Sequence, residues 1–441
     1  MNQKPIPTYS YRRGFFWLFI FFVLALIPLF IGYGWNLPDY RGFWEELGLS
    51  MGFVGLGLFA VQFLFSGRIR QVAPAFGVDN IVQFHKEMGV IALLFGMAHP
   101  VILIAVDSSY WGFFDPRVNL PRALALGAAS VGMMLLLVTS LWRSLVGLSY
   151  EWWRLLHGLL GSLILFVGIV HALQVGHYLN DWLKMLLFGG YLGGFLYLFV
   201  HSRVVRPFQN SKHPYAIDEV IPEKDDCYTL RLKPCTGERL HYEPGQFLWI
   251  TIQSSPFSMQ QHPFSFSSSP LEPLIAITAK RLGDFTRDWI HLKPGQTAFI
   301  EGPYGSFTLK DRPCFLVMGG IGVTPAISIL KTLAIRQDTR RCILIYGNES
   351  WNKIPFRQEL AELERLLHLQ IVHVLQEPDQ AWQGERGLID ERLIGKNLPE
   401  DTHAFDYFIC GPEPMMDVAE RTLRNQGIPW KQIYAERFDL A

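Results

Sequence analysis

Two stretches decide the fold of the N-terminal half: HKEMGVIALLFGMAH at residues 85–99 and HGLLGSLILFVGIVH at residues 157–171. They share the pattern His-x3-Gly-x6-Gly-x2-His and are otherwise largely apolar, which is typical of helices surrounded by apolar neighbours. At 100° per residue the spacing of 14 is only about 40° short of four full turns, with a rise of about 21 Å. Each stretch therefore predicts a helix that presents both of its histidines on one face.

Working outward, six apolar stretches are long enough to cross a bilayer, which takes about 20 residues. They cover residues 15–34, 47–65, 84–106, 123–141, 154–175 and 183–201. Half of the chain's residues are hydrophobic and the mean hydropathy is +0.18, which is too apolar for an ordinary soluble enzyme. Arg12 and Arg13 resemble a signal peptide, but five further spans and no small-residue cleavage site follow, so we expect an uncleaved first helix.

The basic residues near the span ends predict the orientation, because cytoplasmic ends carry more lysine and arginine. With the N-terminus inside, the cytoplasmic ends carry Arg12, Arg13, Arg68, Arg70, Lys86, Arg143, Arg154, Arg203 and Arg206, and the outer ends carry Arg41, Arg117, Arg122 and Lys184. We therefore expect a multi-pass protein of the plasma membrane, which is the inner membrane of a bacterial cell, with both termini in the cytoplasm.

The four histidines of the quoted stretches lie inside spans, where ionisable or metal-binding side chains are rare and usually functional. Because the third and fifth spans run in the same direction, His85 pairs with His157 at one depth and His99 with His171 about 21 Å further out. This geometry suits two stacked haems, each held by two imidazoles, with the glycines leaving room for a flat macrocycle. The alternative is that the glycines only pack helices and the histidines hydrogen-bond across the bundle.

The second half has a different composition. Residues 1–205 hold 13 basic and 9 acidic side chains, whereas residues 206–441 hold 26 and 30. The zero net charge of the whole chain argues against a nucleic-acid-binding protein, which needs a basic excess to neutralise phosphates. All five cysteines lie in this half, too far apart for a zinc ribbon or an iron–sulfur loop. A membrane half thus precedes a soluble half in a reducing compartment.

In the soluble half the pattern of predicted strands and helices changes near Arg312. Before it, short apolar runs at 228–232, 247–252 and 274–278 predict a small antiparallel β-barrel. After it, strand-like runs at 314–318, 342–346, 369–375 and 407–410 alternate with helical stretches at 326–334, 356–367 and 414–425. Such alternation predicts an α/β domain with a parallel sheet and a nucleotide at its carboxyl edge. We expect domains at 1–205, 206–311 and 312–441.

Several motifs fall where that edge is expected. Residues 315–325, FLVMGGIGVTP, run from a strand through glycines into a helix, whose amides and dipole suit a pyrophosphate. Cys410-Gly411-Pro412 closes a later strand. Upstream lie three shorter motifs, HPFSFSS at 262–268, GDFT at 283–286 and GPYG at 302–305. Each alone could be a plain loop, but their order and combination favour a dinucleotide site.

At this point the chain resembles the NADPH oxidase and ferric reductase superfamily over nearly its full length. The six spans with paired histidines are similar to a ferric-reductase-type transmembrane domain, here of a bacterial type because no EF-hand calcium loop is present. The soluble half is similar to ferredoxin-NADP reductases. The resemblance implies FAD, two b haems and NADPH or NADH as electron donor.

The resemblance also implies roles for individual residues. His262, Pro263, Phe264 and Ser265 match the flavin motif, with Ser265 near the flavin ring and Ser267 and Ser268 continuing the contact. The resemblance assigns binding of the FAD phosphates to Lys280, Gly283, Asp284, Phe285 and Thr286. The cofactor-binding motif that follows contains Gly302, Tyr304 and Gly305. The resemblance assigns binding of the nicotinamide nucleotide to Gly320, Gly322, Thr324 and Pro325, and it places Cys410, Gly411 and Pro412 near the transferred hydride. Glu436 and Phe438 match the C-terminal segment that covers the flavin, although three residues follow Phe438 here.

The predicted function is a transmembrane electron relay from cytosolic NAD(P)H through FAD and two haems to an outer acceptor, either dioxygen or ferric iron. The loop 107–122 is expected either to shape the acceptor site or to be a plain connection. After the strand at 343–346 the chain has Glu349 where NADPH-using relatives often have arginine, which favours NADH, although Arg357 is near in sequence. The alternative function is a membrane electron carrier that serves a protein partner or quinone.

Overall fold

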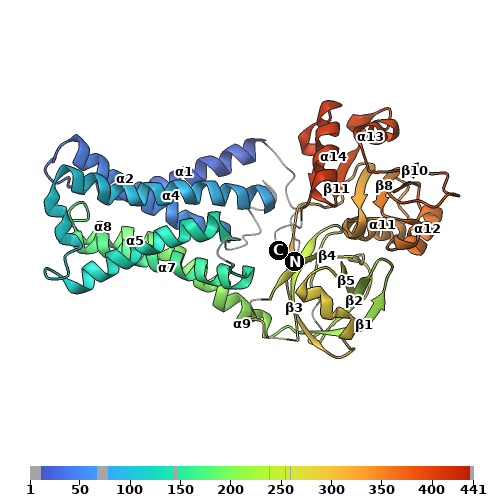
Figure 1. Ribbon diagram of the computed structural model, residues 1–441, viewed down its shortest axis with the longest axis horizontal. Helices are drawn as coiled ribbons and strands as arrows, with labels where there is room; N and C mark the ends of the chain where they lie inside the picture. The colour runs from blue at the N-terminus through green and yellow to red at the C-terminus, as the bar shows by residue number, and fades with distance from the viewer. Residues whose placement is uncertain are drawn as a thin grey trace. The chain divides into compact units, whose positions relative to one another are not determined.

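The structure is a computed structural model that describes residues 11–66, 78–143, 147–237, 239–253, 255–258 and 260–437. The chain divides into two compact units, one formed mainly by residues 10–206 and the other by residues 207–441. The helices and strands of both units are labelled in Figure 1. Each unit is described below on its own.

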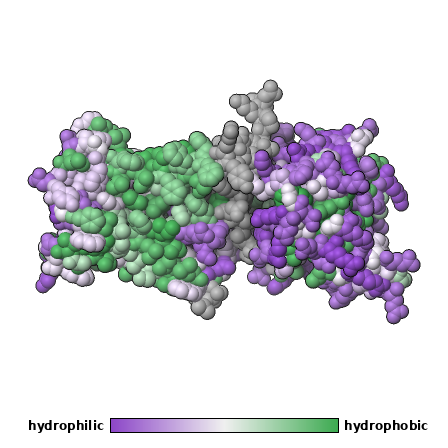
Figure 2. Space-filling model, turned by 90° about the horizontal axis from the view of Figure 1, so that it is seen from above, coloured by the Kyte–Doolittle hydropathy of each residue, from purple (hydrophilic) through white to green (hydrophobic). Residues whose placement is uncertain are grey.

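The first unit is a bundle of apolar helices. It contains α1 (Tyr11–Tyr33), α2 (Phe43–Ser66), α4 (Val78–Val106), α5 (Leu120–Leu141), α7 (Tyr150–Val175) and α8 (Trp182–Val200). Within the described residues, six helices are long and apolar enough to cross a membrane, as the hydropathy pattern predicts. The outward faces carry large apolar side chains such as Phe19 and Leu94, and Figure 2 shows the resulting hydrophobic belt. The chain is a multi-pass membrane protein.

Consecutive helices give the bundle two ends. At the end called here the far end lie the connections 34–42, 107–119 with the short helix η1 (Ser108–Phe113), and 176–181. At the opposite, linker end, α8 continues through a π-helical turn η2 (His201–Val205) into α9 (Arg206–Asn210), which leads out of the bundle. Polar caps begin several helices, since Asn119, Ser149 and Asp181 accept bonds from backbone amides of α5, α7 and α8.

The second unit starts with an antiparallel sheet in the order β4-β3-β6-β1-β2-β5. Its strands are β1 (Tyr215–Pro222), β2 (Cys227–Pro234), β3 (Phe247–Ile252), β4 (His262–Ser265), β5 (Ile275–Lys280) and β6 (Thr297–Tyr304), with the short α10 (Asp284–Arg287) and η3 (Asp288–His291) after β5. A bridge between Phe266 and Ile277 joins the two edges, so the sheet curls towards a barrel around a core that includes Phe266 and Trp289.

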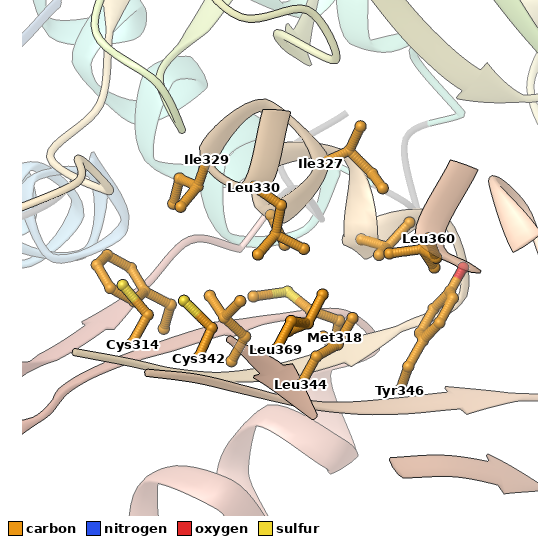
Figure 3. Packing of buried hydrophobic residues seen from close by; sticks show 14 of the residues in the cluster. Cys314, Met318, Ile327, Ile329, Leu330, Cys342, Leu344, Tyr346, Leu360 and Leu369 are labelled. Carbon is orange, nitrogen blue, oxygen red and sulfur yellow. The ribbon is translucent and has the colours of Figure 1, made fainter. Parts of the chain in front are cut away.

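The same unit continues with a parallel sheet in the order β10-β9-β8-β7-β11-β12. The elements are β7 (Cys314–Gly319), η4 (Gly320–Val323), α11 (Thr324–Ile335), β8 (Cys342–Asn348), η5 (Trp351–Lys353), α12 (Arg357–Leu366), β9 (Leu369–Leu375), β10 (Glu385–Arg386), α13 (Glu391–Asn397), η6 (Thr402–Ala404), β11 (Asp406–Cys410), α14 (Glu413–Asn425), η7 (Trp430–Gln432) and β12 (Ile433–Ala435). Figure 3 shows Cys314, Cys342 and Leu344 of the sheet packed against Leu330 of α11. The predicted fold class is confirmed: six apolar helices, an antiparallel barrel-like sheet and a parallel α/β sheet.

The sequence pattern missed three strands of the antiparallel sheet, β1, β4 and β6. His262–Ser265 was expected to follow a strand but is itself the edge strand β4, paired with β3. Pro263 lies in the middle of β4, and a proline is tolerated there because an edge strand needs hydrogen bonds on only one side. The pattern likewise gave no signal for β1 or β6, although each has eight residues; Asp218 and Glu219 interrupt the apolar run of β1, and Glu301 and Gly302 that of β6.

Candidate functional site

The four histidines of the bundle meet in two pairs. The ring centres of His85 and His157 are 6.1 Å apart, and those of His99 and His171 are 6.4 Å apart. Both members of each pair come from α4 and α7, which run in the same direction, so equal spacing along the two helices produces equal depth. The inner pair, His85 and His157, lies towards the linker end, and the outer pair, His99 and His171, towards the far end.

These separations fit one metal ion between two imidazoles. A histidine nitrogen binds a metal at about 2 Å, and a ring nitrogen lies roughly 1.2 Å from the ring centre, so two imidazoles on opposite sides of a metal have centres about 6 Å apart. Among the residues that the structure describes, no group of three or more His, Cys, Asp or Glu side chains could hold a metal ion. A metal in either pair would therefore bring its remaining ligands with it, as the iron of haem does.

A cavity of about 220 Å³ surrounds the outer pair. His99 and His171 line it together with apolar residues and with Gly52, Gly96 and Gly168. Gly96 and Gly168 are the second glycines of the two quoted stretches; both line the cavity, and an added Cβ would lie 3.2 Å from Met133 at Gly96 and 2.7 Å from Leu56 at Gly168. At the inner pair, a Cβ added to Gly89 would meet no atom within 4 Å, whereas one at Gly161 would touch Phe63 at 3.7 Å. The bundle thus has room for a flat group at the outer pair.

The second ring nitrogens of two histidines have partners that the sequence could not identify. The Nδ1 atom of His99 lies 2.9 Å from the carbonyl oxygen of Gly48 on α2, which can only accept, so Nδ1 carries the proton. This tautomer leaves Nε2 with a lone pair for a metal. His157 Nδ1 lies 3.3 Å from the hydroxyl of Ser140. Because the first partner is a backbone atom, no residue type marks it in the sequence.

Gly52 has no side chain, and this leaves the space that the His99 ring occupies. A Cβ at this position would lie 2.8 Å from His99 Nδ1, closer than real Cβ contacts come. Three residues further along α2, a Cβ at Gly55 would lie 2.9 Å from the backbone nitrogen of Gly96. Helices α2 and α4 therefore approach each other closely enough for a backbone carbonyl of α2 to reach a ligand on α4.

A polar network lies at the far end beside the outer pair. Arg41 donates to Glu45 at 3.2 Å and to Tyr110 at 3.2 Å, and its Nη2 lies 3.1 Å from His177 Nδ1. Tyr178 donates a short hydrogen bond to Glu46. Tyr110, His177 and Tyr178 also line the cavity of the outer pair.

In the sequence His177 stands at the end of a span without a matched histidine, which predicts an interfacial position; in the structure it lies in the connection after α7 and contacts Arg41. Because an arginine only donates, the bond from Arg41 makes Nδ1 of His177 an acceptor and leaves the proton on Nε2. Burial, followed by the nearby Arg41, lowers the pKa of His177, which keeps the ring neutral. Its Nε2 is buried and has no hydrogen-bond partner among the described residues. His177 therefore offers a donor within the wall of the outer cavity.

The loop that follows α4 contributes to the same wall. Tyr110, Phe113 and Phe114 of residues 107–119 line the cavity, and Phe113 contacts the His171 ring at a centre-to-centre distance of 5.8 Å. Arg122 donates to the carbonyl of Gly112 at 2.9 Å and so ties the loop to α5. Of the two readings of this loop, the structure favours a part in shaping the cavity.

In the soluble unit, the motifs HPFS and GDFT pack together. The ring centres of His262 and Phe285 are 4.4 Å apart, and Phe264 contacts both Phe285 and Trp289. The hydroxyl of Thr286 accepts bonds from the backbone amides of Leu282 and Gly283, so it stabilises the turn. Asp284 is exposed and pairs with Arg287. The structure thus brings both motifs to one side of the barrel-like sheet.

Three polar side chains that the resemblance assigned to FAD make bonds within the protein. Ser267 accepts from Thr278 at 2.9 Å and is buried. Ser268 is fully buried, lies 2.7 Å from the hydroxyl of Tyr242 and accepts from the amide of Ala276. Lys280 forms an ion pair with Asp225. In this arrangement the two serine side chains stabilise the sheet, and the amide of Ser267 and the carbonyl of Ser268 are also bonded within the protein.

The glycine motif lies at the carboxyl edge of the parallel sheet, as predicted. Gly319 ends β7 and η4 leads into α11, where Pro325 occupies the first turn. A Cβ at Gly322 would lie 2.6 Å from the carbonyl oxygen of Cys410, and one at Gly319 would lie 2.7 Å from Pro412. The ends of β7 and β11 therefore touch backbone to backbone, which brings the two predicted nucleotide motifs together.

The residues expected at hydride transfer converge on Phe247. Ser265 is buried and pairs with Phe247 across β4 and β3. Gly305 has φ of +98°, and a Cβ there would lie 2.3 Å from Glu436 Oε1 and 3.0 Å from Phe247. The amide of Glu436 donates to the carbonyl of Ile409, next to the buried Cys410. Ser265, Glu436 and Cys410 thus belong to one region of the unit, while Phe438 lies outside the described residues.

Glu349 follows β8 at the same edge, where the ribose of a nicotinamide nucleotide is expected. It accepts a short bond from Lys353, which lowers the pKa of Glu349 and raises that of Lys353. Both side chains are about half exposed. Arg357, the candidate for compensating the charge, instead donates to the carbonyl of Trp351 at 2.9 Å and lies over its ring.

Three family comparisons cover most of this arrangement. Residues 51–168 match the ferric reductase like transmembrane component, residues 219–308 match an FAD-binding domain, and residues 316–421 match an oxidoreductase NAD-binding domain. These three matches, in this order, fit a fusion of the ferric reductase and NADPH oxidase type. The chain is a membrane oxidoreductase that carries FAD- and NAD-binding domains in a ferredoxin-reductase-like module.

Relatives of the fusion match its soluble half. The chain is 31% identical over 211 residues to the ferredoxin reductase component of 3-ketosteroid-9-alpha-monooxygenase from Rhodococcus rhodochrous, covering 46% of this chain and 57% of that protein. It is 28% identical to the anthranilate 1,2-dioxygenase electron transfer component of Acinetobacter baylyi, covering 46% and 59%. The chain thus spans about three fifths of these relatives. The solved ferredoxin reductase in carbazole 1,9a-dioxygenase matches with 24% identity and a TM-score of 0.45, covering 51% of this chain and 69% of that one.

Proposed function

We propose that the fusion takes electrons from cytosolic NAD(P)H and delivers them through FAD and two b haems to an acceptor on the other side of the membrane, either dioxygen or ferric iron. The observation that carries this proposal is that two parallel helices form two histidine pairs. In each pair the ring centres have the separation expected for two imidazoles that bind one metal ion. A structural role for four such histidines would not require this separation twice.

The residues of the soluble unit would bind and orient the two nucleotides. The glycine edge of β7 and the start of α11 offer backbone amides to the nicotinamide nucleotide, and Cys410 lies where β11 meets that edge. Ser265 and Glu436 flank Phe247 on the side of the barrel-like sheet. FAD, when bound, supplies the conversion of a two-electron hydride donor into single electrons.

In the bundle, His85 and His157 would ligate the inner haem, and His99 and His171 the outer one. Haem, when bound, supplies a one-electron carrier whose iron has no open position under two imidazoles, so an acceptor has to be reduced at the haem edge. The Gly48 carbonyl holds His99 in the tautomer that presents Nε2. With the cytoplasm negative, the membrane potential favours the outward transfer of each electron by about 2.3 kcal/mol per 100 mV.

The far-end network supports the position of the acceptor. Arg41 is cationic and His177 keeps a proton on the nitrogen that has no partner among the residues described, so both favour an oxygen-bearing acceptor that gains negative charge. The apolar lining of the cavity suits dioxygen, whereas a ferric chelate would have to be reduced at the mouth of the cavity.

A second candidate function is an electron-carrier subunit that serves a protein partner or quinone. It is favoured by the names of the two relatives, which are a ferredoxin reductase component and an electron transfer component. Cytochrome c reduction that superoxide dismutase inhibits would favour the oxidase. Reduction of added quinone or of a co-purified protein, without superoxide, would favour the carrier.

The nucleotide is proposed to be NADH. The position after β8 holds an acidic side chain, and Arg357 is bonded to Trp351 rather than free for a 2′-phosphate. Because Glu349 is exposed and already paired with Lys353, its repulsion of a phosphate is screened, so we expect a Glu349→Gln variant to gain only a few-fold in kcat/KM for NADPH relative to NADH. An unchanged ratio would contradict a role for Glu349 in the preference.

The proposed function is tested with purified full-length protein in detergent. Anaerobic addition of NADH should bleach the FAD absorbance and sharpen the haem bands, and addition of air or ferric chelate should reverse the change. Reoxidation by air alone would identify dioxygen as acceptor, and reoxidation by chelate alone would identify ferric iron. Protein that binds FAD but no haem would contradict the relay.

A further inference from the structure

The last two turns of α2, towards the linker end, contain a buried amide with no hydrogen-bond partner among the described residues. Gln62 is 7% exposed, and neither its Oε1 nor its Nε2 atom has a hydrogen-bond partner in the part of the chain that the structure describes. An unsatisfied amide inside the apolar region of a membrane bundle is costly. A group of this kind is retained when another group, absent from the protein alone or displaced in it, completes its hydrogen bonds.

The packing of α2 against α4 shows what faces Gln62. Built Cβ atoms show that Gly48 faces Leu103, Gly52 faces His99 and Gly55 faces Gly96. Each step forward along α2 is thus matched by an equal step backward along α4, as expected for antiparallel helices. Extended at the same spacing beyond Gly55, the register would place Gln62 at the level of Gly89, beside which there is open space.

The same register relates Gln62 to the inner histidine. Gln62 lies 14 residues after Gly48 on α2, and His85 lies 14 residues before His99 on α4. A step of 14 residues brings a helix back to nearly the same face. The position of Gln62 on α2 relative to His85 on α4 therefore corresponds to the position of Gly48 relative to His99. Gly48 supplies the oxygen that orients His99, and the Nδ1 atom of His85 is itself buried without a partner among the described residues.

We propose that Gln62 is the positioning residue of the inner haem ligand, with its Oε1 accepting the proton of His85 Nδ1 directly or through one buried water. The inference rests on the proposed function, because it applies when His85 Nε2 faces a metal. The amide takes the part at the inner site that a backbone carbonyl takes at the outer site. An acceptor on Nδ1 fixes the tautomer of the ring and raises its basicity, which favours the oxidised iron.

The experiment is a potentiometric titration of the haem absorbance in the full-length, haem-loaded protein. A His99→Ala background isolates the inner site, and Gln62→Leu removes the acceptor at nearly constant size. We expect the inner midpoint potential to rise, because loss of an orienting partner weakens binding by about tenfold or more, and a tenfold change for one electron equals about 59 mV. Haem release from the inner site should accelerate by a similar factor.

Two further variants make the result specific. Gln62→Glu keeps an acceptor and should leave the midpoint at or below that of the parent protein. Gln83→Leu, on an exposed residue of α4 that donates to Glu87, is the matched control and should leave it unchanged. Equal midpoints for Gln62→Leu, Gln83→Leu and the parent would overturn the inference while leaving the relay intact. A parent protein without haem would overturn the proposed function instead.

Discussion

The two histidine pairs of the bundle consist of the same residue type from the same two helices at nearly the same separation, but their surroundings differ. The outer pair lies in a cavity whose wall carries His177 and Tyr110, both bonded to Arg41, and the backbone of Gly48 fixes the orientation of His99. The inner pair has Ser140 beside His157, while the Nδ1 atom of His85 and the side-chain amide of Gln62 lack hydrogen-bond partners in the described part of the chain. A repeated sequence pattern thus supplies the ligands twice, and different neighbours prepare one site to meet an acceptor and the other to pass electrons on.

The largest expected effect separates the two pairs. His99→Ala removes one of only two ligands of the outer haem, so we expect reduction of the outside acceptor to fall by at least about a hundredfold, since metal affinity depends on both ligands. Reduction of a soluble dye at the flavin should stay within about twofold. The comparison is broken if His99→Ala reduces the outside acceptor at the normal rate.

Gly52→Ala tests whether the outer ligand depends on α2. The added Cβ would lie 2.8 Å from His99 Nδ1, so the ring has to move and its bond to Gly48 is strained. We expect the outer haem to bind about 10 to 100-fold more weakly, with the inner haem retained, as measured by haem content and the rate of haem loss. Gly190→Ala is the control, because a Cβ there meets no atom within 4 Å.

Full haem occupancy in Gly52→Ala would show that His99 adapts without cost. The two sites would then not differ in how rigidly they hold their ligands, and the contrast drawn above would rest on the cavity wall alone.

A smaller effect is expected from His177→Leu, which removes the free donor of the outer cavity. We expect reoxidation of the reduced protein by its acceptor to slow by about tenfold, the usual worth of a hydrogen bond to a developing charge. Reduction by NADH should not change, because His177 belongs to the far end. Stopped-flow absorbance separates the two phases, and an unchanged reoxidation rate would remove His177 from the acceptor site.

The smallest effect is expected from Ser140→Ala. Its hydroxyl lies 3.3 Å from His157 Nδ1, at the long end of the range for a hydrogen bond, so its loss should change inner haem retention by less than about tenfold. The measurement is the rate of haem transfer to an acceptor protein such as apomyoglobin. A loss as severe as that caused by removing a ligand would show that the inner pair depends on His157 far more than its geometry suggests.

The sequence allowed the fold class and the pairing of the four histidines to be predicted because both depend on periodicity. Hydropathy marks six helices, and a spacing of 14 places two histidines of each helix on one face whatever the packing. The partner of His99 could not be predicted, since it is the backbone of Gly48. Nor could the bond between Arg41 and His177, which joins two connections 136 residues apart.

In the soluble half, the glycine edge was predictable because close backbone contact tolerates little else, as Gly322 against Cys410 illustrates. The roles of Ser267 and Ser268 were not, since a motif does not reveal that Thr278 and Tyr242 occupy their hydroxyls. The strands β1, β4 and β6 were not predicted because their pairing depends on distant segments rather than on local pattern.

The central claim is that the four histidines hold two haems, and haem content with a redox spectrum tests it most directly. The full-length protein, purified with its cofactors and titrated with NADH without oxygen, should contain two b haems per chain and show the split reduced bands of bis-histidine ligation. His99→Ala and His85→Ala should each lose one of the two. Protein that binds FAD and oxidises NADH but contains no haem would contradict the account.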